Sequence, residues 1–147
     1  MIVLFMTLHY FLSPGLTGFP SPAESWEERP LNGHDLLVPH PESTFFGRVE
    51  GDGMGGAGMY DSDLLVIDRA LEPGHGDIVV AVYEGHLSVK RLLLHQQHAR
   101  LCSEPLHRPP VLLDGLPFEV WGVVTAAIHL YHPSLLSKLL RSSRSSR

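Results

Sequence analysis

Short runs rich in β-branched and aromatic residues, separated by Gly, Asp and Pro, dominate the sequence from residue 44 onward. Their lengths and composition are typical of strands joined by tight turns. The runs cover residues 44–49, 64–67, 77–83, 86–92, 99–102 and 118–131. This pattern predicts an all-β fold, a compact domain of hairpins over residues 44–132.

The clearest hairpin spans residues 79–92. Glu84 and Gly85 supply turn chemistry between two strands that are rich in Val. Side chains alternate across a strand, so Ser88 and Lys90 are expected on one face of the second strand and the residues between and beside them on the other.

The last run, residues 118–131, is about twice the usual length of a strand. Gly122 in its interior is a candidate bend, because glycine weakens a strand and permits a sharp change of direction. We expect this strand to serve two sheets.

Both ends of the chain differ from this domain in composition. Residues 13–32 hold four of the twelve prolines, and proline breaks both helix and sheet. We therefore expect residues 1–43 to form an extended N-terminal arm. Residues 133–147 carry basic residues between pairs of Ser and are expected to form a flexible tail.

Length and charge narrow the classes of function. A chain of 147 residues with 44% hydrophobic residues fits one globular domain with short appendages. The formal net charge of -5 argues against a dedicated nucleic-acid binder, whose affinity depends on a basic face. A link to DNA is therefore expected through a partner protein, without direct sequence-specific binding.

The cysteine count and the N-terminus predict a cytoplasmic protein. Cys102 is the only cysteine, so neither an intramolecular disulfide nor a cysteine-based zinc cluster can form within the chain. Residues 1–12 are apolar but lack a basic n-region, and they are fewer than the roughly 20 residues of a membrane span. We expect no membrane anchor.

Ten histidines raise the question of a metal site. His95 with His98 and His129 with His132 are spaced three residues apart, which suits one face of a helix, yet both pairs fall in strand or loop regions. No Cys or carboxylate cluster completes a site near them. We expect no metal and no other cofactor.

The segment that carries chemistry is Gly51-Asp52-Gly53-Met54, followed by three more glycines before residue 59. A turn that requires positive φ explains one or two of these glycines. The string is not a phosphate loop, because it lacks the Gly-Lys-Ser/Thr ending and a following helical pattern.

Six short segments, in order along the chain, resemble the UmuD branch of the LexA/UmuD self-cleaving proteases. They are Gly18-Phe-Pro-Ser-Pro-Ala23, Leu36-Leu-Val-Pro-His-Pro41, Gly51-Asp52-x-Met54, Asp63-Leu-Leu65, Gly76-Asp-Ile-Val79 and Val89-Lys90. The match runs from about residue 18 to about residue 129 and so covers most of the chain. The resemblance implies a LexA/UmuD-like peptidase fold for residues 44–132.

The resemblance also implies a mechanism and partners. In this family a Ser/Lys dyad cuts the protein's own arm when a RecA filament on single-stranded DNA stabilises the cleavable form. The trimmed protein is a dimeric accessory subunit of a translesion polymerase whose catalytic chain is UmuC. By position, Lys90 is the implied general base, the backbone of Met54 the implied oxyanion donor, and Thr17-Gly18 the implied scissile bond. A hydroxyl at the place of Ser88 is implied to orient the lysine.

The sequence departs from the family at the nucleophile. Gly53 occupies the place of the serine in the family's Gly-Asp-Ser-Met, and Lys90 follows it at about the family's own spacing. Glycine has no side chain to attack a carbonyl, and loss of the nucleophile lowers turnover by about 10⁶ in a well-studied serine protease. Ser88 is poorly placed to substitute, because attack requires a hydroxyl near the N–H groups of the 53–54 turn.

A lysine acts as a base near pH 7 only when apolar surroundings lower its pKa. The Val-rich hairpin around Lys90 is expected to provide such surroundings.

Two hypotheses follow. The first is a catalytically inactive, UmuD-like SOS-response protein, a homodimer that binds the RecA filament and a UmuC-like polymerase. Its arm would pack through Phe19 and Trp26. The second keeps the enzyme class, a Ser/Lys self-cleaving serine peptidase that is active or is cut in trans by an active homologue. Thr17 is larger than the residue that the family prefers before the cut, which weakens the second hypothesis.

Two other classes fit less well. A repressor domain would need an N-terminal helix-turn-helix, for which the residues before the first core strand are too few and too rich in Pro. A signal-peptidase-like enzyme would need a membrane anchor.

Overall fold

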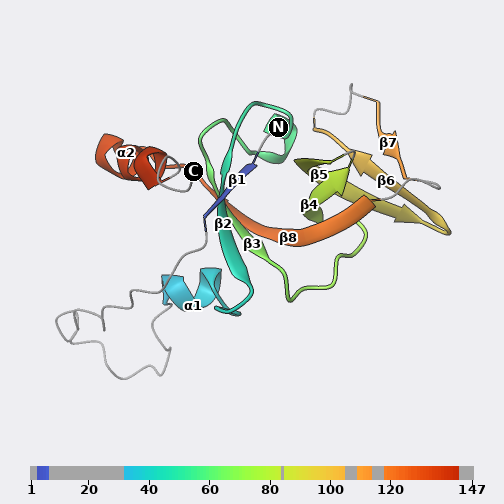
Figure 1. Cartoon of the computed structure of the whole chain (residues 1–147), viewed down its shortest axis with the longest axis horizontal. Coiled ribbons are helices and arrows are strands. Elements are labelled where there is room, and N and C mark those ends of the chain that lie inside the picture. The colour runs from blue at the N-terminus through green and yellow to red at the C-terminus, as the bar shows by residue number, and fades with distance from the viewer. Residues whose placement is uncertain (1–2, 7–31, 84, 105–108, 114–117, 143–147) are drawn as a thin grey trace, which may run out of the picture.

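The computed structural model describes residues 3–6, 32–83, 85–104, 109–113 and 118–142. Eight strands form one sheet in the order β1-β2-β3-β8-β4-β5-β6-β7 (Figure 1). Every pairing between neighbouring strands is antiparallel. In chain order the elements are β1 (Val3–Met6), α1 (Gly33–Leu37), β2 (Thr44–Val49), the 3-10 helix η1 (Gly55–Ala57), β3 (Leu64–Asp68), β4 (Ile78–Tyr83), β5 (His86–His95), β6 (His98–Cys102), β7 (Val111–Leu112), β8 (Phe118–Ile128) and α2 (Pro133–Ser142).

The six predicted runs are all strands in the structure, so the expected all-β class is confirmed. The predicted hairpin is β4 and β5, whose register pairs Val79 with Lys90 and Tyr83 with His86. Gly85 in its turn has a φ of 76°, a conformation that glycine adopts at no steric cost.

β8 joins the two halves of the sheet. Its residues 118–123 pair with β4, and its residues 123–128 pair with β3. The register shifts once in each ladder, at Trp121 against β4 and at Thr125 against β3. Such bulges bend a strand, and β8 curves visibly between the two groups of strands (Figure 1). The expectation that this strand serves two sheets is wrong, because β8 joins two groups of strands within one continuous sheet.

Gly122 lies beside the bulge at Trp121, close to the end of the neighbouring strand β3. A Cβ atom at Gly122 would lie 2.7 Å from Cγ2 of Ile67, a fully buried and branched side chain. We expect Gly122→Ala to lower the free energy of unfolding by about 1–3 kcal/mol, because overpacking forces neighbouring groups to shift. Urea denaturation measures this loss. Gly33→Ala is the matched control, since its Cβ would meet nothing within 4 Å, and equal stability of the two variants would contradict the close packing.

Apolar side chains cover both faces of the central strands. One core cluster consists of Val49, Met54, Met59, Leu65, Ile67, Val80 and Val89. The other consists of Val79, Ala81, Leu92, Leu101, Leu113 and Val123. Val79 and Val80 are adjacent on β4 and belong to different clusters, so β4 is buried on both faces. Lys90 pairs with Val79, which assigns Lys90 to the face of the second cluster.

Five elements lie outside the predicted pattern, among them the three-residue helix η1 in the glycine-rich turn. β7 has two residues and α1 has five, too few for a periodic signal. β1 adds an edge strand to β2 within the segment expected to be an arm. α2 forms in the segment expected to be a flexible tail, where Leu recurs at a spacing that suits one face of a helix. None of the helices in the described ranges has the length and apolar character needed to span a bilayer.

Candidate functional site

The turn over residues 51–54 is tightly anchored. Gly51 has a φ of 88°, and its N–H donates to the carboxylate of Asp61 at 2.8 Å. Met54 is fully buried in the first core cluster. The carbonyl of Met54 accepts hydrogen bonds from the N–H groups of Ala57 and Met59 at 3.0 and 3.2 Å. The buried side chain and these bonds fix the path of the backbone at the implied nucleophile position.

Gly53 is buried in this turn. Among the described glycines, those with positive φ are Gly51, Gly58, Gly76 and Gly85. Gly53 is outside this group, so its backbone has a conformation that residues with side chains adopt. Its carbonyl accepts the N–H of Glu104 at 3.0 Å, and the carbonyl of Glu104 accepts the N–H of Gly56 at 3.2 Å. These two bonds fasten the turn to the residues that follow β6.

Lys90 lies half-buried on β5, and its amine donates a hydrogen bond to the hydroxyl of Ser103 at 2.5 Å. The register explains the contact. Arg91 pairs with Cys102 across β5 and β6, so Lys90 and Ser103 face each other one step further along. Ser103 is 5% exposed. Since Ser103 and Glu104 are consecutive, one short segment contacts both Lys90 and the Gly53 turn.

An ion pair on the opposite face holds the same segment. The Nε of Arg91 donates to the carboxylate of Glu104, and a second nitrogen of Arg91 donates to the carbonyl of Gly76 at 2.7 Å. The hydrogen bond to Glu104, reinforced by its charge, raises the pKa of Arg91 despite the opposing effect of burial. Glu104 is thus fixed through its side chain as well as through its backbone.

The sequence-predicted site residues are only partly within the described structure. Lys90, Gly53 and Met54 are described, and the segment of Ser103 and Glu104 connects the first two. Thr17 and Gly18, together with the expected anchors Phe19 and Trp26, lie outside the described residues.

Sequence reasoning missed Ser103. The signal that could have found it is the β5–β6 hairpin, because a turn at Gln96-Gln97 places residue 90 opposite residue 103. Ser88, the expected orienting hydroxyl, is half-buried and pairs with Ala81 of β4.

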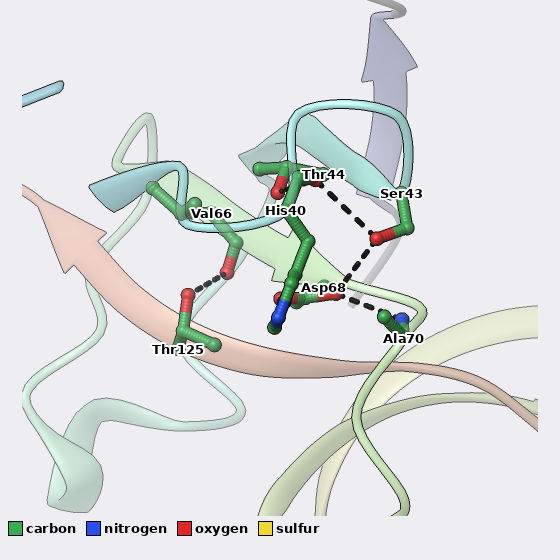
Figure 2. Close-up of polar contacts among 7 residues, drawn as sticks. All are labelled: His40, Ser43, Thr44, Val66, Asp68, Ala70 and Thr125. Atoms are coloured by element: carbon green, nitrogen blue, oxygen red, sulfur yellow. Dashed lines mark hydrogen bonds and ion pairs between the residues drawn. The ribbon is translucent and has the colours of Figure 1, made fainter. Parts of the chain in front are cut away.

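A second polar cluster surrounds Asp68, which is 1% exposed at the end of β3 (Figure 2). One carboxylate oxygen lies 2.6 Å from Nδ1 of His40. The other accepts the hydroxyl of Ser43 at 3.1 Å and the N–H of Ala70 at 2.8 Å. The carbonyl of His40 also accepts the hydroxyl of Thr44 at 2.7 Å. The cluster ties the chain that enters β2 to the chain that leaves β3.

The Asp68 cluster contains Ser, His and Asp but is not a catalytic triad. A triad requires the serine hydroxyl on the ring nitrogen remote from the aspartate, whereas Ser43 donates directly to Asp68. Burial raises the pKa of Asp68, but hydrogen bonds from His40, Ala70 and Ser43 outweigh it and hold this pKa below its ordinary value. The arrangement stabilises an ionised carboxylate and so has a structural role.

Another pair of Asp and His, Asp63 with His129, lies at the other end of β3. Asp63 accepts the N–H of Tyr60 at 2.9 Å, and its second oxygen lies 2.5 Å from Nδ1 of His129.

His95 and His98 pair across the β5–β6 hairpin. Within the described part of the chain, no three His, Cys, Asp or Glu side chains come together as a metal site would require.

Comparison with known proteins identifies the family of this chain. The profile of the family described as Peptidase S24-like matches residues 15–125. Protein MucA of Salmonella typhimurium is 40% identical over 134 residues, which cover 88% of this chain and 89% of MucA. Protein ImpA of Escherichia coli is 43% identical over 114 residues, covering 76% and 77% of the two chains. Protein SamA of Salmonella typhimurium strain LT2 is 41% identical over 112 residues, covering 76% and 78%. The chain therefore belongs to the peptidase S24-like family, as a UmuD-like member of its LexA/UmuD branch.

Proposed function

We propose that this chain is an SOS-response protein, an accessory and regulatory subunit of an error-prone translesion DNA polymerase that does not cleave its own arm. The observation that supports the absence of self-cleavage is the presence of glycine at position 53. Gly53 occupies the nucleophile position of the family in a turn that is fully formed, with Met54 buried and the Gly53 carbonyl bonded to Glu104. The anchored turn supports the proposal that the scaffold of the family's site remains without the attacking oxygen.

The proposed partners follow from the family. They are a second copy of this chain, the RecA filament on single-stranded DNA and a UmuC-like polymerase. The proposed location of these interactions is the cytoplasm. The sheet supports the proposal of a homodimer, because it ends in two strands, β1 and β7, that each pair with one neighbour in the sheet. Such edges can pair with further strands unless they are protected, and two-fold dimers are the commonest homo-oligomers.

The second candidate function is a Ser/Lys self-cleaving peptidase, active by itself or cut in trans by an active homologue. One observation favours it. The amine of Lys90 contacts a hydroxyl, that of Ser103, although the family's serine is absent. In trans, the homologue would bind the arm of this chain and cut after Thr17.

A cleavage assay separates these functions. The purified chain is incubated with activated RecA filament, alone and together with an active UmuD-like homologue, and the products are resolved by gel and mass spectrometry. We expect the chain alone to remain whole. Loss of residues 1–17 only in the presence of the homologue would identify a substrate cut in trans. Loss of the same residues from the chain alone would overturn the proposal that the chain does not cut itself.

A further inference from the structure

We propose that Ser103 is a nucleophile with Lys90 as its general base, a site that reacts with activated acyl compounds such as esters with good leaving groups. The inference does not depend on the proposed role in a polymerase. It starts from the 2.5 Å contact between the amine of Lys90 and the hydroxyl of Ser103. A nucleophile within hydrogen-bond reach of its base is the geometry that hydroxyl activation requires.

The strand register pre-organises this pair. Lys90 lies in β5, and Ser103 directly follows β6, which is hydrogen-bonded to β5. The ion pair of Arg91 with Glu104 holds the same two chain segments together on the other face. Groups held by paired strands keep their relative positions better than groups on separate loops. The contact is thus built into the sheet.

Ser103 is the more buried member of the pair. Ser103 is 5% exposed, and its face of the sheet carries Val79, Leu92 and Leu101, all at most 2% exposed. Other described serines donate to oxygen instead: Ser43 to Asp68, Ser62 to Asp61 and Ser137 to a carbonyl. The contact with a lysine distinguishes Ser103 from these three.

The proposed step balances without any co-reactant. As the oxygen of Ser103 forms a bond to the acyl carbon, its proton passes to the neutral amine of Lys90. The bond from the acyl carbon to the leaving group breaks, and the leaving group departs as an anion or takes the proton from the ammonium of Lys90. Ser103 then carries the acyl group as an ester.

One hydrogen bond limits the class of substrate. The N–H of Glu104, the residue after Ser103, already donates to the carbonyl of Gly53 and is not free to hold an oxyanion. Loss of one such donor lowers turnover by about 10²–10³ in a serine protease. Activated esters depend less on that stabilisation than peptide bonds do. The site therefore accepts activated acyl groups while the arm stays uncut.

The test uses the full chain and p-nitrophenyl acetate, with release of p-nitrophenolate followed by absorbance and the acetyl group located by peptide mass spectrometry. We expect acetylation of the Ser103 oxygen. Lys90→Met should slow that acetylation by about 100-fold, the lower end of the usual contribution of a general base. Ser103→Ala should remove it, and Ser137→Ala in α2 should match the unaltered chain.

Locating the acetylated residues of the unaltered chain decides the outcome even if a variant fails to fold. Acetyl groups found only on lysines, histidines or the N-terminus would overturn the proposal. Acetylation of the Lys90 amine in place of the Ser103 oxygen would do the same, because the amine would then be the nucleophile. The arm-cleavage assay is read separately, so either proposal can fail while the other stands.

Discussion

The Gly53→Ser variant is expected to lose residues 1–17 when it is mixed with activated RecA filament, while the unaltered chain stays whole. The variant places a hydroxyl at the position that the resemblance implies for the nucleophile. Gly53 is not among the described glycines with positive φ, so a side chain there meets no backbone strain of that kind. Loss of a nucleophile costs about 10⁶ in turnover, so its return should change cleavage from undetectable to readily measured.

Its pH dependence tests the base. Lys90 can accept the serine proton only as a neutral amine, so cleavage by Gly53→Ser should rise with pH as the lysine loses its proton. Gly53→Ala is the matched control and should stay whole, since a methyl group cannot attack a carbonyl. Adding Lys90→Met to Gly53→Ser should abolish cleavage. If Gly53→Ser itself stays whole at every pH, Lys90 is not available as a base for residue 53.

The largest loss of stability is expected for Asp68→Ala. Asp68 is 1% exposed and accepts contacts from His40, Ser43 and Ala70. Removing it deprives three donors of their acceptor, and we expect the free energy of unfolding to fall by about 3 kcal/mol. Urea denaturation near pH 7 measures the change. Asp35→Asn in α1 is the control and should have no effect, because the Asp35 side chain is 77% exposed.

The same carboxylate predicts how stability depends on pH. The pKa of Asp68 is lower in the folded chain than its ordinary 3.8, so the folded state favours the ionised form. This contribution is fully present above the ordinary pKa and is lost as the pH falls through the lower folded value. The stability gap between the unaltered chain and Asp68→Asn should therefore be constant near neutral pH and shrink below about pH 4. A gap that persists in acid would contradict the assignment.

The pattern of short apolar runs predicted the strands well because strand signals are local. Residues 44–49 were expected as a strand and form β2 with the same bounds. The implied roles of Gly53 and Lys90 stay a prediction, and the structure adds only that the segment of Ser103 and Glu104 contacts both residues. The long strand with Gly122 was recognised by its length, but its pairing with both β3 and β4 is known only from the structure.

The remaining features depend on contacts between distant residues. Ser103 meets Lys90 only through the register of β5 and β6. His40 meets Asp68 across 28 positions of sequence, and neither residue alone suggests the other. α2 was missed because Ser and Arg dominate its neighbourhood, and composition there outweighed the spacing of its leucines.

The place of β1 changes what a cut in the arm would accomplish. Val3–Met6 pairs along β2, so the chain is held to the sheet on both sides of Thr17-Gly18. Severing that bond would leave the leading fragment paired with β2. While its backbone stays paired with Phe46–Val49, a sizing column would report an intact particle where a denaturing gel reports two pieces.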